Sequence, residues 1–167
     1  YSDLNAKAGK PAYIILKLNN LVDEDLIERL YKASIAGVKI QMIIRGICSL
    51  VPGVKGLSEN IQVISILDRY LEHSRVLVFA NGGNELMYIS SADWMGRNLD
   101  RRVEVATPIL DVDIKNEIRA TLEFQLKDNQ KARVIDGKQQ NKYVVQNGLK
   151  IRSQKKTYEM FAEKMQG

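Results

Sequence analysis

Two short apolar runs separated by one amphipathic segment constrain the fold of this chain more than any other feature. Residues 13–18 read YIILKL and residues 38–44 read VKIQMII, and each run has the length and composition of a buried strand. Between them, apolar residues recur at helical spacing from Leu26 to Ile35, and Gly37 ends the pattern. A strand, a helix and a strand in this order form a β-α-β unit with parallel strands and a right-handed crossover. The fold class is therefore expected to be α/β.

Polar residues directly follow both predicted strands. Asn19 and Asn20 come after the first strand, and we expect Asn20 to cap the helix. Arg45 comes after the second strand, and Gly46 begins a loop with two further glycines. Ligands of β-α-β units collect beyond the carboxyl ends of the strands, and an arginine beside glycine-rich backbone suits an anion. A plain connecting loop is the alternative, because neither a Walker sequence nor a G-x-G-x-x-G sequence is present.

A β-hairpin is predicted further along the chain. Its two strands are residues 76–79 and 87–90, and the sequence NGGN at residues 81–84 forms the turn between them. The glycines permit the positive φ angles that such turns need. If Ala80 pairs with Glu85, the register of the hairpin is set, whereas a slip of one residue would turn every side chain to the other face.

This register gathers polar side chains at the open end of the hairpin. The first strand is expected to include His73 and Arg75, with Arg75 opposite Ser90 and with Ser91 and Asp93 nearby. An imidazole serves as a nucleophile or a proton shuttle near neutral pH, and an arginine holds a planar anion. Asp93 is expected to fix the tautomer of the histidine. The alternative is that this single histidine only packs against, or caps, a neighbouring element.

The remaining elements are predicted from periodicity and turn residues. Within a strand over residues 101–109, Arg102 and Glu104 share one face, either as a surface ion pair of little energetic value or as part of a site. The other predictions are a strand at 61–66, a helix from Asp111 to about Lys127, short strands at 132–135 and 142–145 around an Asp136-Gly137 turn, and a helix at 154–165.

Composition and charge bound the class of protein. The 167 residues fit one domain, and the single cysteine excludes a disulfide framework and a cysteine metal site. The net charge of +5 is uneven, since residues 127–167 carry 10 Lys and Arg against 4 Asp and Glu. A basic end attracts nucleic acid, membrane surfaces or phosphate chains, although a solvated surface is an equal alternative. Because the sequence starts at Tyr1 rather than Met, we expect it to be part of a longer polypeptide.

Several sequence blocks, in this order, resemble the C-terminal catalytic domain of bacterial polyphosphate kinases. The blocks are NNLVDEDLIERLYKASIAGVKI, IIRGIC, GLSENI, VISILDRYLEHSR, FANGG and SSADWMGRNLDRRVEV. The resemblance covers nearly the whole chain to about Pro108 and is looser beyond it. It implies a phospholipase D-like fold, a mixed β-sheet flanked by helices. It also implies that residues 1–167 form the second such domain of a multidomain enzyme, with a basic segment at 128–167 that ends in an amphipathic helix.

The resemblance implies a phosphotransferase that moves the terminal phosphate of ATP to inorganic polyphosphate, reversibly, through a phosphohistidine. His73-Ser74-Arg75 and the run from Ser90 to Asp93 are similar to the H-x-K and G-S-x-N elements of phospholipase D relatives. Arg75 stands in the lysine position, a departure expected for the kinase rather than for a phosphodiesterase. Asn20 stands where the family usually has serine, which is a mild departure.

The roles that the resemblance assigns are few. Arg45 and His73 match family residues placed against the nucleotide phosphates, and the possible supporting residues are Asn19, Arg75, Asp93, Arg102 and Glu104. The phosphorylated histidine and the arginines associated with Mg²⁺ belong to the preceding domain of the family, so no metal ligand is expected here and this chain alone is expected to be inactive.

The resemblance also sets expectations about partners. They are ATP or ADP, inorganic polyphosphate, the N-terminal domains of the same polypeptide and further copies of it in a homo-oligomer, but no specific nucleic acid. Location in the cytoplasm is expected, with peripheral association at the inner membrane as an alternative.

Two other classes of protein fit parts of the pattern. A phospholipase D-type phosphodiesterase or nuclease would assemble its site from two copies of the domain and hydrolyse a diester. A non-enzymatic polyanion-binding module would use the basic last quarter of the chain, and its binding would be salt-sensitive and independent of Arg45.

Overall fold

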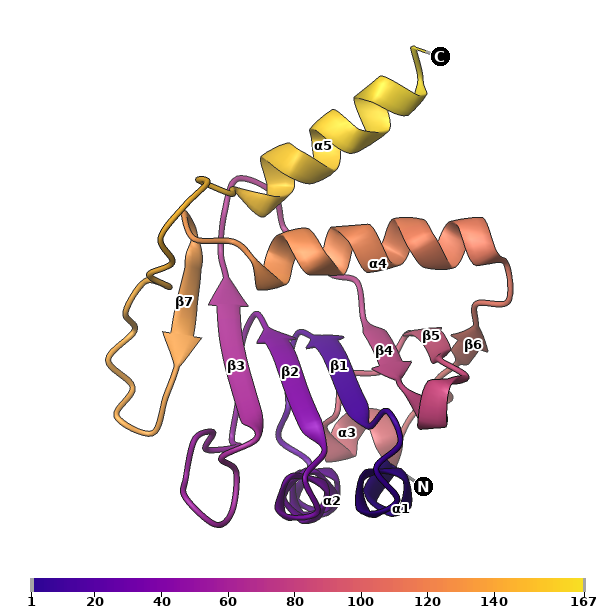
Figure 1. Ribbon diagram of the computed structural model, residues 1–167, viewed down its shortest axis with the longest axis vertical. Coiled ribbons are helices and arrows are strands. Elements are labelled where there is room, and N and C mark those ends of the chain that lie inside the picture. Colours follow the sequence, from indigo (N-terminus) through magenta and orange to yellow (C-terminus); the bar gives the residue numbers. More distant parts are fainter. Residues whose placement is uncertain (1, 167) are drawn as a thin grey trace.

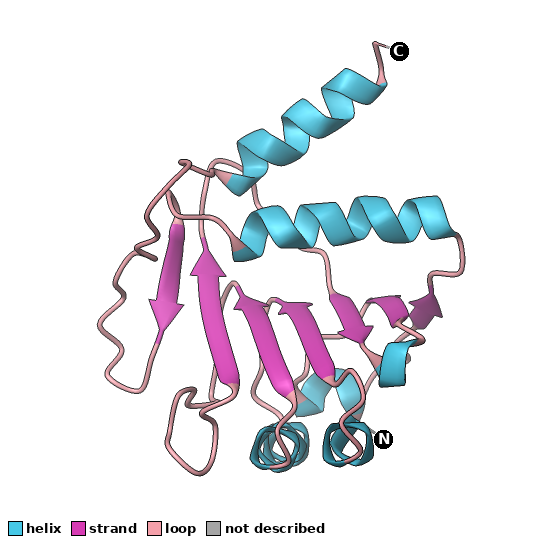
Figure 2. Ribbon diagram, viewed as in Figure 1, coloured by secondary structure: helices cyan, strands magenta, loops and turns pink. Residues whose placement is uncertain are grey.

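The computed structural model describes residues 2–166, and one seven-stranded mixed sheet with helices on both faces organises them (Figures 1 and 2). The strand order is β6-β5-β4-β1-β2-β3-β7. The strands are β1 (Tyr13–Leu18), β2 (Lys39–Ile44), β3 (Ile61–Ile66), β4 (Val76–Phe79), β5 (Leu86–Ser90), β6 (Ala106–Pro108) and β7 (Ala132–Ile135). The helices are α1 (Ser2–Lys7), α2 (Glu24–Ile35), α3 (Gly96–Leu99), α4 (Val112–Leu126) and α5 (Ser153–Lys164), with a 3-10 turn η1 (Asn81–Gly83).

The predicted β-α-β unit is confirmed. β1 pairs in parallel with β2, and β2 pairs in parallel with β3, so three carboxyl ends meet at one edge of the sheet. The predicted cap of α2 was wrong, because Asp23 rather than Asn20 caps the helix, its side chain accepting a hydrogen bond from the Leu26 backbone at 3.0 Å. Asn20 is held elsewhere, by contacts to Asp93 and to the loop after β2.

Alternate residues of β1 support two separate cores. Ile14, Leu16 and Leu18 pack with α2 on one face of the sheet. Ile15 faces the other side and belongs to the cluster that includes Leu122 of α4. Because a strand alternates its side chains between faces, a central strand covered on both sides is apolar at nearly every position. Lys17 is the exception in β1, and it lies on the α4 side.

The hairpin of β4 and β5 has the predicted register. Val76 pairs with Ile89 and Phe79 with Leu86, and the Ser90 backbone amide donates to the Arg75 carbonyl at 3.0 Å. The prediction that the strand includes His73 and Arg75 was wrong, because β4 begins at Val76 and residues 67–75 form a loop. This loop leaves the sheet and carries His73 to an exposed position.

Two further strand predictions were too long. The predicted strand at residues 101–109 is reduced to β6, since the backbone at 101–105 turns instead and Val103 is 99% exposed. The predicted strand at residues 142–145 makes a bridge at Tyr143 opposite Arg133 rather than a regular strand. In both segments few side chains are buried. The alternation of apolar and polar residues therefore does not correspond to a strand with one buried face.

The C-terminal quarter is attached through α4. Asp111 caps α4, its side chain accepting a hydrogen bond from the Ile114 backbone at 3.0 Å. Leu122 of α4 is buried, whereas Leu110, just before the helix, is 80% exposed. Asp128 is wholly buried and its carboxylate accepts from four backbone amides, including that of Ser153 at the start of α5. α5 packs against α4 and then extends away from the sheet (Figure 1). Within residues 2–166, no helix is long and apolar enough to cross a membrane.

Candidate functional site

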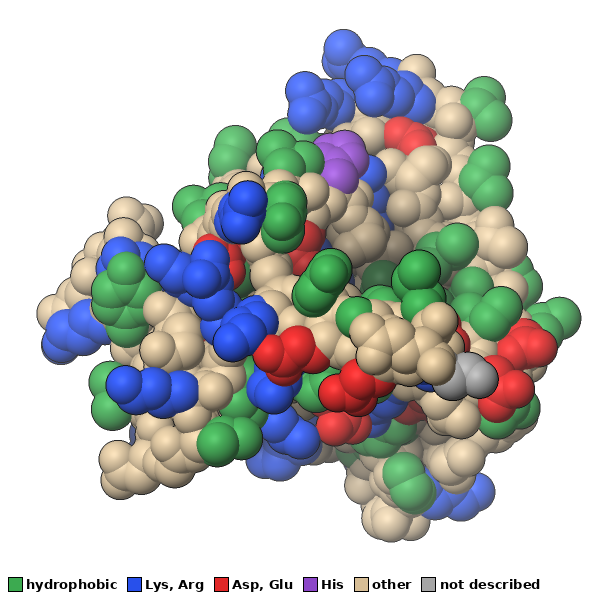
Figure 3. Space-filling model, turned by 90° about the horizontal axis from the view of Figure 1, so that it is seen from above, with side chains coloured by type: hydrophobic (Ala, Val, Ile, Leu, Met, Phe, Trp, Pro, Cys, Tyr) green, Lys and Arg blue, Asp and Glu red, His purple; other side chains and the backbone are tan. Residues whose placement is uncertain are grey.

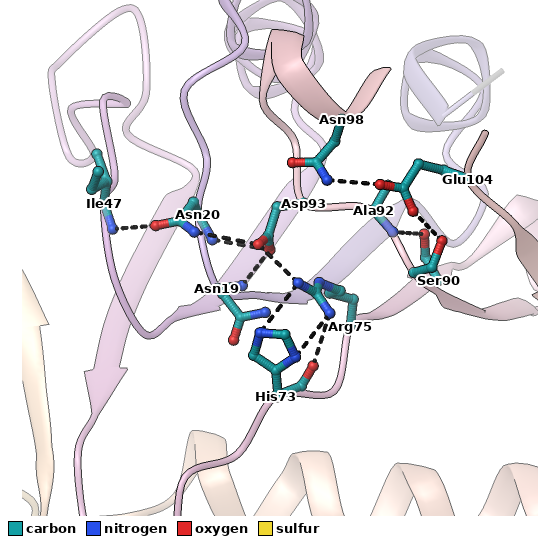
Figure 4. A network of polar contacts seen from close by, with 11 residues as sticks. Asn19, Asn20, Ile47, His73, Arg75, Ser90, Ala92, Asp93, Asn98 and Glu104 are labelled. Atoms are coloured by element: carbon teal, nitrogen blue, oxygen red, sulfur yellow. Dashed lines mark hydrogen bonds and ion pairs between the residues drawn. The ribbon is translucent and has the colours of Figure 1, made fainter. Parts of the chain in front are cut away.

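The buried carboxylate of Asp93 anchors a polar network at the carboxyl end of β1 (Figure 4). Its Oδ1 accepts from the backbone amides of Asn19, at 2.8 Å, and Asn20, at 3.1 Å. Its Oδ2 accepts from the Arg75 guanidinium at 3.0 Å and from the Asn20 side chain at 3.3 Å. Burial alone would raise the pKa of Asp93, but the hydrogen bonds from Arg75 and the two backbone amides outweigh it and hold this pKa below its ordinary value. Asp93 is therefore an ionised structural anchor.

Arg75 connects this anchor to His73. Its Nη2 binds Asp93, while Nη1 lies 3.1 Å from His73 Nδ1 and donates to the His73 carbonyl at 3.3 Å. The expectation that Asp93 fixes the tautomer of His73 was wrong, because the guanidinium of Arg75 stands between the two side chains. The reason is geometric: His73 lies in a loop rather than opposite β5, so the longer arginine spans the gap. Nη2 also lies 3.4 Å from His73 Nε2, so both ring nitrogens face the Arg75 guanidinium, while the residue as a whole stays exposed.

The loop after β2 joins the same network through Asn20. The Asn20 side-chain oxygen accepts from the Ile47 backbone amide at 3.0 Å, and the Gly46 amide donates to the Asn19 carbonyl at 2.7 Å. A Cβ atom on Gly46 would lie 2.7 Å from that Asn20 oxygen and 2.9 Å from the Asn19 carbonyl oxygen. Glycine is therefore required for this close approach, which brings the loop carrying Arg45 against the end of β1.

Asn19 is the residue of this network with the least satisfied side chain. It is 1% exposed, and neither its amide nitrogen nor its amide oxygen has a hydrogen-bond partner within the described chain. In Figure 4 the Asn19 side chain points toward the ring of His73. An unpartnered buried amide costs stability, so a group of this kind beside the exposed His73 is a candidate ligand contact.

Arg45 is half-buried at the end of β2. Its backbone is fixed at both ends, since its amide donates to the Leu18 carbonyl at 3.2 Å and its carbonyl accepts from the Ser65 hydroxyl at 3.2 Å. Its guanidinium makes no hydrogen bond or ion pair among residues 2–166. The backbone is thus held while the charge is available, which is the arrangement that anion binding requires.

The other predicted residues divide into two groups. Glu104 binds the Ser91 hydroxyl and accepts from the Asn98 amide at 2.7 Å, and these hydrogen bonds, together with Arg102 and Arg75, hold the pKa of Glu104 below its ordinary value. These two hydrogen bonds join the ends of the segment between β5 and β6, which contains α3. Arg102 is exposed and shares no strand face with Glu104, so the predicted pairing along a strand was wrong.

Sequence reasoning missed Lys17, which is 3% exposed in the middle of the sheet. Burial lowers the pKa of its ammonium, the Glu72 carboxylate opposes that effect, and Arg45 and Arg75 add to it. The only signal in the sequence was a charged residue inside the otherwise apolar run YIILKL.

No group of three or more His, Cys, Asp or Glu side chains within residues 2–166 is arranged to hold a metal ion. Asp93, the carboxylate at the centre of the network, already accepts four hydrogen bonds. The residues of this site therefore do not fit a Mg²⁺ ion held by this chain alone.

The basic C-terminal segment forms a different feature. It lines a hollow of about 440 Å³ whose walls are Gln130, Lys131, Leu149, Lys150, Arg152, Lys155, Lys156 and Glu159. Several of these charges are already paired, as Arg152 is with Asp68 at 2.6 Å and Lys156 with Glu159 at 2.8 Å. Figure 3 looks onto the side of α4 and α5, where Lys and Arg side chains lie among acidic ones and the single histidine reaches the surface.

Comparisons with known proteins agree on one family. The family model described as polyphosphate kinase C-terminal domain 2 matches residues 3–154. A polyphosphate kinase from Vibrio cholerae serotype O1 is 59% identical over 156 residues, which are 93% of this chain and 22% of that protein. The crystal structure of polyphosphate kinase from Porphyromonas gingivalis superimposes with a TM-score of 0.94 at 47% identity, over 98% of this chain and 25% of that one.

A more distant structure shows the breadth of the fold. Nuc from Salmonella typhimurium, a phospholipase D family member, matches with a TM-score of 0.56 at 12% identity, over 81% of this chain and 89% of its own. The likeness extends to the fold alone, and it confirms the phospholipase D-like sheet that the sequence blocks implied. The chain spans about a quarter or less of the length of the two polyphosphate kinases it matches.

Proposed function

This chain belongs to the polyphosphate kinase family as a C-terminal domain, and we propose that it supplies nucleotide and phosphate binding to a phosphotransferase. The proposed reaction transfers the terminal phosphate of ATP to inorganic polyphosphate, reversibly. It passes through a phosphohistidine on a preceding domain of a longer polypeptide. His73 is the only histidine of this chain, and its proposed role is to assist that group rather than to replace it.

The observation that carries the proposal is that one polar network, centred on Asp93, places two basic groups, His73 and Arg45, at the same edge of the sheet. Asp93 holds Arg75, Arg75 contacts His73, and the imidazole remains exposed. Asn20 ties the loop after β2 to the same carboxylate, which brings the unpaired guanidinium of Arg45 to that edge. Both basic groups are therefore positioned by the same network: the Arg45 guanidinium is available for an anion, and the exposed His73 ring lies against the Arg75 guanidinium.

The chemistry of phosphoryl transfer suits this arrangement. The reaction needs charge compensation on the non-bridging oxygens and in-line positioning, and little covalent help. Arg45 can clamp a phosphate with its planar fork, and His73 can donate a hydrogen bond or a proton to the transferring group. Arg75 is committed to Asp93 and so positions His73, while Arg102 adds positive field from an exposed site.

The wider expectations are also proposals. Mg²⁺ would neutralise the nucleotide phosphates, and its ligands are proposed to lie in the preceding domain. We propose that the full-length polypeptide is a homo-oligomer in the cytoplasm, either free or peripheral at the inner membrane. Size measurement and cell fractionation of the full-length protein test these two points.

One set of assays tests the proposed function against its rivals. The 167-residue chain and a polypeptide that also carries the preceding domains are each incubated with ATP, with a model phosphodiester and with polyphosphate. We expect no turnover by the chain alone and ATP-dependent polyphosphate synthesis by the longer polypeptide. Hydrolysis of the diester by the chain alone would support the phosphodiesterase instead.

The binding module predicts a third pattern. It requires salt-sensitive binding of nucleic acid and polyphosphate alike, unaffected by the substitution Arg45→Ala. The proposed function requires that Arg45→Ala weaken ATP binding by about 10-fold or more, since a hydrogen-bonded charge contact contributes about 1.5–3 kcal/mol.

A further inference from the structure

The ammonium group of Lys17 is buried without a hydrogen-bond or ion-pair partner in the described chain. It lies in β1, where it pairs with Ile43 of β2 on one side and with Val76 of β4 on the other. Its neighbours on that face form the apolar cluster that packs against α4. The side chain is 3% exposed, and no hydrogen bond or ion pair holds its ammonium group among residues 2–166. The ammonium nitrogen is not one of the wholly enclosed unpartnered atoms, so the small exposed fraction lies at the charged tip.

The charges around Lys17 are those of the candidate site. Glu72 attracts the ammonium, while Arg45 and Arg75 repel it. Glu72 directly precedes His73 in the chain, and its carboxylate also accepts from the Gln125 amide of α4 at 3.0 Å. Arg75 is neutralised by Asp93, but Arg45 and Lys17 together leave an excess of positive charge at this edge of the sheet.

Stability gives no reason for a lysine at this position. Moving an ammonium out of water costs several kcal/mol unless a partner compensates, and an apolar side chain of similar length avoids that cost. Lys17 and Asn19, on either side of Leu18, are both buried, and neither side chain has a hydrogen-bond partner among residues 2–166. Both amide atoms of Asn19 are fully enclosed. Unsatisfied polar groups collected beside one set of basic residues indicate a ligand that satisfies them.

We propose that the Lys17 ammonium binds a non-bridging oxygen of the phosphate chain held by Arg45 and His73. The ligand class is an inorganic or nucleotide polyphosphate, and the inference rests on the proposed function for that choice. The bound anion supplies the hydrogen-bond acceptor that the described chain lacks at this position, and it adds to the negative charge of Glu72. Lys17 then acts together with Arg45, from inside the sheet rather than from a loop.

A purely structural role makes the opposite prediction. If Lys17 served only to hold Glu72 and the loop at residues 67–75, its loss would destabilise the fold and leave ligand affinity unchanged. If it binds the ligand, its replacement by an apolar residue leaves the unliganded fold as stable or more stable while affinity falls. The two roles therefore separate in the sign of the stability change.

The test compares Lys17→Met and Lys17→Arg with the control Lys32→Met, whose lysine is 68% exposed and paired with Glu28. Thermal unfolding of the 167-residue chain without ligand measures stability. Calorimetric titration of the full-length polypeptide with inorganic tripolyphosphate measures affinity. We expect Lys17→Met to unfold at or above the wild-type midpoint and to bind about 10- to 100-fold more weakly. Lys17→Arg is expected to retain part of the affinity, and Lys32→Met all of it.

Either of two results would overturn the inference: tripolyphosphate affinity of Lys17→Met within about twofold of wild type, or an equal loss of affinity in Lys32→Met. A loss of stability in Lys17→Met with unchanged affinity would assign the structural role instead. Polyphosphate synthesis by the wild-type polypeptide is measured in parallel. If synthesis is absent but tripolyphosphate still binds through Lys17, the proposed function fails while this binding site stands.

Discussion

Replacing Asp93 by asparagine removes the charge at the centre of the network while nearly preserving its shape. The carboxylate is 4% exposed and accepts from two backbone amides, from Arg75 and from Asn20. Asparagine retains one acceptor oxygen for the backbone amides, but its amide nitrogen then faces the Arg75 guanidinium, donor against donor. The variant therefore keeps the local fold partly satisfied and leaves the charge of Arg75 unpaired.

The expected loss of stability is about 3 kcal/mol, the lower end of the roughly 3–5 kcal/mol found when one partner of a buried ion pair is removed. For a domain of this size each kcal/mol lowers the unfolding midpoint by about 2–4 °C, so we expect a decrease of about 6–12 °C. Thermal and urea unfolding of the 167-residue chain, followed by circular dichroism, measure this directly. The matched control is Glu28→Gln, which removes the carboxylate of an exposed pair with Lys32 at 2.7 Å and should cost about 0.5 kcal/mol or less.

The pH dependence gives a second check on the same variant. The pKa of Asp93 is lower in the folded chain than in the unfolded chain, so its stabilising effect is fully present above the unfolded pKa of about 3.9. As the pH falls below that value toward the folded pKa, the carboxylate takes up a proton and the effect is lost. The gap between wild type and Asp93→Asn should therefore narrow on acidification. A stability loss below about 1 kcal/mol at neutral pH, or a gap that does not change with pH, would refute the role assigned to Asp93.

Two further predictions concern the loop after β2. Gly46→Ala should destabilise the chain by about 1–3 kcal/mol, because its Cβ atom would lie 2.9 Å from the Asn19 carbonyl oxygen. The control Gly96→Ala should cost less, because its Cβ atom would meet only the flexible end of the Asp100 side chain. Urea unfolding midpoints compare the two variants, and equal midpoints would contradict the requirement for glycine at residue 46. Burial raises the pKa of the Cys48 thiol, so iodoacetamide should alkylate Cys48 at neutral pH more slowly than it alkylates a free thiol in solution. Mass spectrometry measures the two alkylation rates, and equal rates would contradict this prediction.

Sequence patterns predicted the fold well in those elements whose burial requires apolar residues at regular spacing. Strands β1 and β2 are covered on both faces, so their apolar runs and the helix between them could be recognised directly. The hairpin register followed from the short turn at residues 81–84, since a tight turn leaves little freedom in pairing. At residues 101–105 and 142–145 the segments are largely exposed, and alternation there predicted strands that do not form.

The sequence predicted which residues form the site but not which of them hydrogen-bond to each other. His73, Arg75 and Asp93 do come together, yet the hydrogen bonds run through Arg75 because the chain leaves the sheet before His73. The roles of Asn19 and Lys17 follow from their lack of hydrogen-bond partners once they are buried. A short stretch of sequence does not show which distant residues will supply such partners. That information exists only after the strands have been assembled, which is why Lys17 could be identified only from the structure.

The most direct test of the account is the rate of polyphosphate synthesis by the full-length polypeptide carrying His73→Ala. The ring is exposed and its removal should leave the unfolding midpoint of the 167-residue chain close to wild type, so any loss of rate reports chemistry rather than folding. We predict a decrease of about 100-fold or more, the usual size of a general acid–base contribution. A rate within about twofold of wild type, with the fold intact, would contradict the assignment of His73 to the phosphoryl-transfer site.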